Sequence, residues 1–253
     1  MTERRSAAVS FDGTFEGFLC IVHAYYYEGI SPTEIFPEST ATHQPTLETP
    51  DEFHITTDLT RACKVHDAIG EKISAEAFDY INLAFLSNDT GKYMSIFQYI
   101  LLGFKIGHRV DDHLQQDYVL ETHKLARNVG GEAHLLTGFC RFAETTSGVY
   151  YCKISPKNHT LPILAEHFRD RMSTQPWIIH DKKRSLAAIY DGKEYIITPV
   201  PRDAAVENSD NEAFVQDLWK TFFNALAIKE RKNLKLQRNN LPLHFRKFMT
   251  EFN

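Results

Sequence analysis

At 253 residues, with 43% hydrophobic and 24% charged residues, the chain is long enough to bury a core and has an ordinary globular composition. Its net charge of -5 excludes a protein that attracts nucleic acid by its overall charge, so such binding would need a local basic patch. No apolar run approaches the ~20 residues that span a bilayer, and no apolar signal-peptide segment follows the N-terminal charges, so we expect a cytoplasmic protein.

The spacing of the cysteines and the absence of common catalytic motifs exclude several enzyme classes. Cysteines 20, 63, 140 and 152 have no metal-site spacing, and we expect Cys140 and Cys152 to lie close together as free thiols. The CxxxCxxC triplet of radical-SAM enzymes is missing, as are HExxH, GxSxG, the P-loop and GxGxxG. His108, Asp111 and Asp112 could share a helical face, but the two aspartates are more simply the start of the next helix. We therefore expect no metal and no other cofactor.

The first element predicted is a short strand over residues 7–11. A turn at Asp12-Gly13 follows, and Thr14 then caps a helix over residues 15–28. Residues 29–60 contain four prolines and six acidic residues, with no Lys or Arg before Arg61. This composition is typical of a surface loop or linker, here over residues 30–60 with one short strand at 53–57. A boundary could fall there, but a single domain over residues 1–253 is the simpler interpretation.

From residue 61 to 136 the apolar spacing is helical. Ser74 caps one helix, and a second helix follows the turn at residues 88–91. A third helix begins at Asp117 and contains the pair Gly130-Gly131. These segments predict a helical layer of three or four elements.

Strand-like periodicity replaces the helical spacing after residue 137. GFCRFAE and GVYYCKI predict a hairpin, and a helix is expected over residues 163–172. PWIIHD, SLAAIYD and EYIITPV predict three further strands, the last two joined by a turn at Asp191-Gly192-Lys193. The order β-β-α-β-β-β indicates an α+β fold in which a helical layer packs on a mainly antiparallel sheet of about five strands.

The C-terminal segment, residues 219–253, is basic. A helix over residues 213–228 precedes most of it, and we expect Val215, Leu218, Phe222 and Leu226 of that helix to face inward. Residues 219–253 carry eight Lys or Arg and two acidic residues, a net charge of +6. Such a cluster can neutralise phosphates, and an asparagine can add hydrogen bonds to sugars or bases. The predicted nucleic-acid-binding residues of this segment are Arg231, Lys232, Asn233, Lys235 and Arg238. A solvated helix face, or a surface for an acidic protein, would explain the same charge.

Residues 156–184 concentrate histidine, aspartate and arginine between strand-like runs. The candidate acid/base residues are His159, His180 and Asp181, because a histidine beside an aspartate can act as an oriented base. Arg169, Arg171 and Arg184 could hold a phosphate. A purely structural role, in which His180 ends a strand and Asp181 starts a turn, explains the same residues.

Four ordered blocks of the chain resemble a known family. They are FDGTFEGFLC, FKIGHRVDDHL, NHTLPILAEHFRDRMSTQPWIIHDKKRSLAAIYDG and IKERKNLKLQRNNLPLHFRKFM. They resemble a bacterial family of unknown biochemical activity that is assigned to DNA metabolism or DNA repair. Its members are typically encoded beside a radical-SAM protein assigned to DNA repair, and some are fused to a uracil-DNA-glycosylase-like domain. The resemblance covers nearly the whole chain outside residues 30–60.

The resemblance implies DNA as a partner, together with a radical-SAM DNA-repair protein and, in some bacteria, a uracil-DNA-glycosylase-like protein. It carries over no catalytic residue. The chain departs from the family's Pro-x-Arg-Tyr-Trp-Lys ending, since residues 242–247 read PLHFRK and lack the indole that could stack on a base.

Three hypotheses from different classes follow. The first is a DNA-associated accessory protein that binds nucleic acid through its basic segment and acts with a radical-SAM partner. The second is an enzyme that acts on damaged DNA or a nucleotide through His159, His180 and Asp181. The third is a protein–protein adaptor that docks a partner through its acidic and basic segments. We expect no membrane partner under any of the three.

Overall fold

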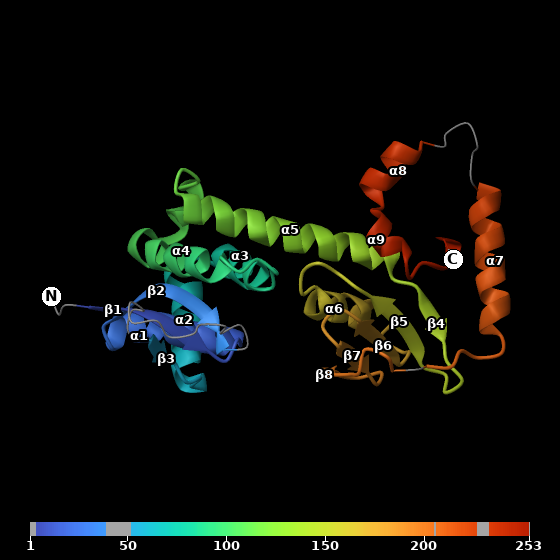
Figure 1. Ribbon diagram of the computed structural model, residues 1–253, viewed down its shortest axis with the longest axis horizontal. Coiled ribbons are helices and arrows are strands. Elements are labelled where there is room, and N and C mark those ends of the chain that lie inside the picture. Colours follow the sequence, from blue (N-terminus) through green and yellow to red (C-terminus); the bar gives the residue numbers. More distant parts are fainter. Residues whose placement is uncertain (1–3, 39–51, 205, 227–232, 253) are drawn as a thin grey trace. The chain divides into compact units, whose positions relative to one another are not determined.

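The computed structural model describes residues 4–38, 52–204, 206–226 and 233–252 (Figure 1). The chain divides into two compact units, Met1–Val129 and Gly130–Asn253, each with helices and a sheet of its own. This confirms the predicted α+β class. That the two units together form one domain stays a prediction.

The first unit is built around a three-stranded parallel sheet. Its central strand β1 (Arg5–Phe11) pairs with β2 (Ile30–Pro37) on one side and β3 (Glu52–His54) on the other. The sequence analysis was wrong about β2, whose residues it assigned to a loop. Proline is tolerated there because β2 is an edge strand, and Pro32 lies opposite Ala7 where the register shifts. The rest of the predicted linker, residues 39–51, lies outside the described residues.

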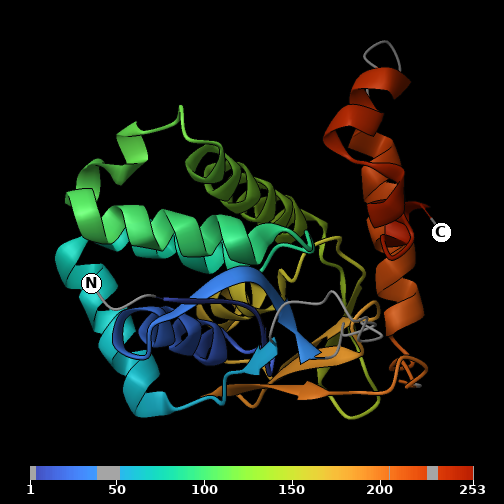
Figure 2. The same ribbon diagram turned by 60° about the vertical axis from the view of Figure 1, so that its left-hand side comes forward.

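The helices of the first unit follow the predicted order. They are α1 (Phe15–Tyr27), α2 (Leu59–Lys72), α3 (Ala75–Phe85), α4 (Lys92–Ile106), the 3-10 helix η2 (Gly107–Asp112) and the first part of α5 (Asp117–Phe139). α1 and α4 both pack against the sheet (Figures 1 and 2). Their contact is aromatic: the rings of Phe11 and Tyr93 meet edge to face at 5.3 Å, and Phe18 is fully buried beside them. Each such buried side chain contributes roughly 1.5–3 kcal/mol.

Local capping confirms the predicted helix starts. The Thr14 hydroxyl accepts a hydrogen bond from the Gly17 amide at 3.0 Å, and Ser74 caps α3 in the same way through Ala77 at 2.9 Å. Asp58, which the sequence analysis did not assign as a cap, accepts from two amides at the start of α2.

Asp12 fixes the turn between β1 and α1. Its Oδ1 accepts hydrogen bonds from the amide and hydroxyl of Thr14, at 2.9 and 2.6 Å, and its Oδ2 accepts from the Thr57 hydroxyl at 2.7 Å. Burial opposes ionisation of Asp12, but these hydrogen bonds outweigh it and lower its pKa. Gly17 faces this carboxylate closely, since a Cβ there would lie 2.4 Å from Oδ1. The FDGTFEG block is therefore one hydrogen-bonded turn that requires glycine at position 17.

The second unit contains the predicted five-stranded sheet. Its strands run β4 (Phe142–Glu144), β5 (Tyr150–Ile154), β6 (Trp177–Asp181), β7 (Leu186–Tyr190) and β8 (Tyr195–Pro199), in that spatial order. Only the β5–β6 pair is parallel, and α6 (Leu161–Arg171) is the helix between those two strands. α6 packs on the sheet through Leu161, Leu164 and Phe168. The order β-β-α-β-β-β and the mainly antiparallel pairing are confirmed.

The chain ends in α7 (Glu212–Leu226), α8 (Leu234–Asn240), α9 (Leu243–Arg246) and the 3-10 helix η4 (Thr250–Phe252). The predicted helix at 213–228 is confirmed over its described residues, 213–226, but its predicted inward face is wrong. Val215, Leu218 and Phe222 are each 53% exposed, and Leu226 is 64% exposed. Helical spacing shows that these residues share a face, whereas covering that face requires contacts from elsewhere in the chain.

Among the helices described, none has the length and apolar character needed to cross a membrane.

Candidate functional site

His180 and Asp181, two of the predicted catalytic residues, end strand β6 and are completely buried. The Tyr151 hydroxyl lies 2.7 Å from Nδ1 of His180, and Nε2 has no hydrogen-bond partner among the described residues. Burial lowers the pKa of His180, and the positive charge of Lys182 lowers it further, so the ring is neutral at pH 7. His180 therefore contacts Tyr151 and does not itself face solvent.

Asp181 holds the turn between β6 and β7. Its Oδ1 accepts from the backbone amides of Lys183 and Arg184 at 2.9 and 3.3 Å, and its Oδ2 pairs with the Arg184 guanidinium at 2.9 Å. Arg184 also donates to the carbonyl oxygens of Pro156 and Lys157. The pair thereby ties this turn to the loop before α6, which is the structural role that the sequence analysis left open.

The other residues of the predicted His/Asp/Arg group lie on or next to α6. His159 is half-buried and precedes Thr160, the N-cap of that helix. Arg169 pairs with Glu166 at 2.7 Å and with Asp170 at 3.2 Å. Arg171 is exposed near the end of the same helix. The arginines are thus divided between separate ion pairs and an exposed position.

The predicted nucleic-acid-binding residues of the basic segment lie on or before α8. Asn233 caps this helix by accepting from the Leu236 amide at 3.0 Å, and Lys235 and Arg238 are exposed. Arg231 and Lys232 lie outside the described residues.

Two other groups that the sequence analysis considered are the segment around His108 and Asp111 and the cysteine pair, which is confirmed as two close free thiols. Asp111 accepts hydrogen bonds from the Tyr99 hydroxyl at 2.6 Å and from His123 at 2.9 Å, so it holds η2 against α4 and α5. No group of three metal-capable side chains occurs within the described ranges. Cys140 hydrogen-bonds to Cys152, and this bond together with burial raises the pKa of the Cys140 thiol.

A cavity of about 270 Å³ in the second unit brings together four cations that are far apart in the sequence. Arg141 precedes β4, Lys153 lies on β5, Lys220 lies on α7 and Lys247 follows α9. No acidic side chain lines the cavity among the residues that the structure describes. An anion about 4 Å from one such charge gains about 4 kcal/mol at an effective dielectric constant of 20, against about 1 kcal/mol in bulk water. We call this site the cationic cavity.

Aromatic rings adjoin the cations. Tyr151 lines the cationic cavity, and the Lys153 amino group lies 5.7 Å from its ring centroid. The Arg141 guanidinium lies 5.3 Å from the ring of Trp219, which is 38% exposed on α7. Because the Tyr151 hydroxyl also bonds to His180, the buried histidine contacts a residue that lines the cavity.

Glu251 binds Arg141, which lines the cationic cavity, and Trp219, whose ring lies beside Arg141. Its carboxylate accepts two hydrogen bonds from Arg141, at 2.6 and 3.2 Å, and one from the Trp219 indole at 3.2 Å. Burial of Glu251 disfavours its charge, but the Arg141 and Trp219 hydrogen bonds prevail and lower its pKa. Glu251 therefore offsets the charge of Arg141, while Lys153 and Lys220 form no ion pair with any described residue.

Sequence reasoning found only part of this site. Lys220 and Lys247 were counted in the basic segment, but Arg141, Lys153 and Tyr151 were not singled out. One signal was available: in GVYYCKI, Tyr151 and Lys153 are two residues apart on a strand and so share a face.

Residues 90–251 match a family described as a domain of unknown function, DUF4130. The chain belongs to the DUF4130 family. No curated protein and no solved structure matches the chain. The DUF4130 match begins just before α4 and contains every residue of the cationic cavity, whereas the three-stranded sheet precedes it.

Proposed function

We propose that this DUF4130 protein is a cytoplasmic DNA-associated accessory protein that binds single-stranded DNA at the cationic cavity. The observation that carries the proposal is the convergence of four cations from separate elements on one cavity without acidic lining. Phosphate is the group that such a site attracts, since each Lys or Arg contact to a phosphate releases counterions. Lys235 and Arg238 add exposed positive charge on α8 of the same unit.

The exposed aromatic rings of α7 favour a single strand. Trp219 and Phe222 have ring centroids 5.9 Å apart, and their faces are partly solvent-exposed next to Lys220. Bases of a single strand can stack on such rings, at about 1–3 kcal/mol per base, whereas bases in a duplex are already stacked on one another. A cation and exposed aromatic rings on one helix therefore favour single-stranded DNA over duplex DNA.

The repair context and the radical-SAM partner rest on a different argument. They follow from the resemblance of the four sequence blocks, and the cationic cavity supports only the DNA part of that hypothesis. In this proposal the chain holds a DNA strand while a partner protein supplies the chemistry.

A second candidate function is an enzyme whose active site is the cationic cavity. The hydrogen bond between Tyr151 and His180 favours it. Tyr151 would touch the substrate and His180 would position its hydroxyl. Asp181 would take no part, because its carboxylate is already bonded to Arg184 and two backbone amides.

Fluorescence anisotropy with labelled single- and double-stranded DNA, across ~50 to 200 mM salt, tests the first proposal. Replacing Lys153 and Lys220 by alanine should weaken single-strand binding and reduce the slope of log affinity against log salt by about 1.4, or ~0.7 per lost contact. Matched controls are alanine at Lys157 and Lys193, which are exposed in the same unit but do not line the cavity.

An unchanged slope in the Lys153 and Lys220 variant, or an equal reduction of the slope in the control variants, would show that the cationic cavity is not the binding surface. Equal affinity for the duplex would contradict the role given to α7.

A further inference from the structure

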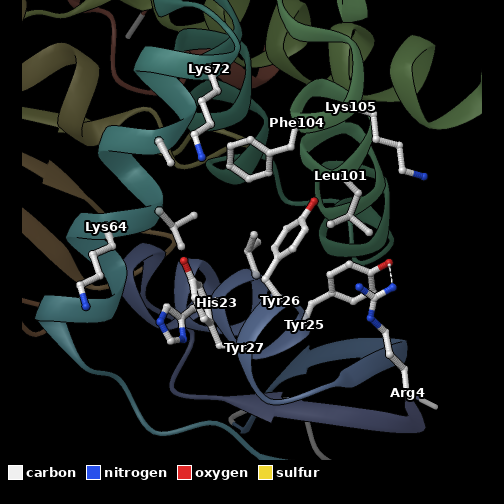
Figure 3. Close-up of a pocket in the computed structure, with 13 residues that line it drawn as sticks. Arg4, His23, Tyr25, Tyr26, Tyr27, Lys64, Lys72, Leu101, Phe104 and Lys105 are labelled. Atoms are coloured by element: carbon white, nitrogen blue, oxygen red, sulfur yellow. Dashed lines mark hydrogen bonds between the residues drawn. The ribbon is translucent and has the colours of Figure 1, made fainter. Parts of the chain in front are cut away.

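The first unit contains a second cavity, of about 550 Å³, between α1, α2 and α4 (Figure 3). Its volume is within the range of about 300–1,000 Å³ that is usual for small-molecule sites. It lies entirely within Met1–Val129, so it is separate from the cationic cavity. Its lining combines open aromatic rings with positive charge.

The aromatic part of this cavity comes mainly from the end of α1. Tyr26 meets Phe104 of α4 edge to face, with ring centroids 5.7 Å apart, and Tyr27 stacks on His23 at 4.4 Å. Tyr26 is 43% exposed and Tyr27 is 76% exposed. These rings are held by their neighbours yet keep open faces, so a planar ligand could stack on them.

The charge comes from four cations, with no acidic side chain in the described lining. Arg4 is fixed, because its guanidinium lies 4.0 Å over the Tyr25 ring and donates to the Tyr25 hydroxyl at 2.8 Å. Figure 3 shows the Lys72 side chain pointing from α2 toward the centre of the cavity, while Lys64 and Lys105 lie on opposite flanks with their amino groups directed outward. These three lysines form no ion pair with any residue in the described ranges.

The nearby acidic residues are engaged mainly with Arg61, and Glu28 also lies 4.0 Å from Nδ1 of the cavity residue His23. Glu28 pairs with Arg61 at 2.7 Å, and Asp58 caps α2 while also pairing with Arg61. Arg61 does not line the cavity. The cavity thus retains unbalanced positive charge beside open aromatic faces, although acidic side chains are close in the sequence.

We propose that this cavity binds a nucleotide, with its base against Tyr26 and Tyr27 and its phosphate held by Lys72. The ligand is expected to be anionic, because Lys72 points into a space whose described lining includes three more cations and no acidic side chain, and to carry a planar ring that uses the aromatic faces. A nucleotide has both features in one molecule. It can be a free mononucleotide or the phosphorylated end of a DNA strand, which have the same chemistry at this site.

Isothermal titration calorimetry with AMP and dTMP, adenosine and inorganic phosphate tests the site on the full chain. Both nucleotides should bind more tightly than either adenosine or phosphate alone. Lys72→Met should weaken nucleotide binding about tenfold or more, the effect of losing one hydrogen bond to a charged group. Tyr26→Ala should weaken nucleotide binding and leave any weak phosphate binding unchanged, while Tyr26→Phe should retain stacking and affinity.

Lys124→Met is the matched control, since Lys124 is exposed on α5 of the same unit and pairs with Glu121 outside the cavity. Circular dichroism of each variant checks folding, and the conservative Tyr26→Phe change keeps the test valid if Tyr26→Ala does not fold. Absence of nucleotide binding at millimolar concentration, or equal binding by wild type and Lys72→Met, would overturn the proposal. Phosphate binding as tight as nucleotide binding would also overturn it.

A labelled oligonucleotide with and without a 5′-phosphate distinguishes the two sources of ligand. Tighter binding of the phosphorylated strand, lost in Lys72→Met and kept when Lys153 and Lys220 are replaced, would identify a strand end. Nucleotide binding without any effect of the 5′-phosphate would identify a free nucleotide. Both results support the site.

Discussion

Replacing Glu251 by glutamine should lower the stability of the second unit and raise its affinity for DNA. The carboxylate is 3% exposed and accepts three hydrogen bonds, two from Arg141 and one from Trp219. Glutamine keeps one acceptor oxygen but removes the negative charge opposite Arg141. Breaking a fully buried ion pair costs about 3–5 kcal/mol, and Arg141 is 23% exposed, so we expect about 2–3 kcal/mol.

The same change should strengthen anion binding, because the charge of Arg141 is no longer offset. One additional unbalanced cation at the cationic cavity should increase affinity for single-stranded DNA about fivefold at low salt and steepen the salt dependence by about 0.7. Stability and binding should therefore change in opposite directions.

Two assays measure the two effects. Thermal unfolding followed by circular dichroism should show a decrease in Tm of about 5–10 °C, and anisotropy with labelled DNA gives the affinity. Glu194→Gln is the control, since Glu194 is exposed in the turn before β8 and its loss changes the net charge by the same amount. A fall in DNA affinity that parallels the loss of stability would refute the reasoning, as would equal effects of the two substitutions.

The lowered pKa of Glu251 adds a pH dependence. Its ion pair stabilises the fold above the unfolded-state pKa of about 4.5, and this contribution is lost as the pH falls through the lower folded-state pKa. Glu251→Gln should therefore flatten the acid limb of a plot of stability against pH. An acid limb identical to that of the wild type would show that Glu251 does not titrate as described.

Three further predictions follow from the packing. Gly17→Ala should destabilise the first unit by about 2 kcal/mol, because the new Cβ displaces the Asp12 carboxylate from hydrogen bonds worth about 3 kcal/mol against ~1 kcal/mol of helix propensity gained. Urea unfolding should show a smaller loss of stability from the same change in an Asp12→Ala background, where only the Thr57 and Thr14 hydroxyls still approach the new Cβ. Tyr151→Phe should lower the free energy of unfolding by about 1–2 kcal/mol, because His180 loses its buried hydrogen-bond partner. A change in the His180 pKa, followed by NMR, should accompany this loss if the hydroxyl is its contact. Phe222→Ser should change stability by less than about 0.5 kcal/mol, since the ring is 53% exposed, yet weaken single-strand binding; a loss of several kcal/mol in stability would mean that the α7 face is covered.

The sequence alone determined the features that depend on near neighbours. Thr14 and Ser74 begin helices because a hydroxyl can accept an amide hydrogen bond three residues ahead, and that chemistry can be read from the sequence. The order of the five strands and α6 followed from periodicity in the same way, because side-chain alternation is a local property. The class and the order of elements in the second unit were therefore predictable.

Only the tertiary structure decided where the charges and rings converge. β2 was missed because an edge strand tolerates proline, and whether a strand lies at an edge depends on its partners. The apolar stripe of α7 was recognised, but its exposure depends on what packs against it.

The candidate site follows the same rule. Arg141, Lys153, Lys220 and Lys247 meet because β4, β5, α7 and the chain end pack together, and Glu251 offsets one of them across that packing. A sequence lists charges in order along the chain. An electrostatic site depends on distances between residues that are far apart in that order, and those distances are fixed only when the chain folds.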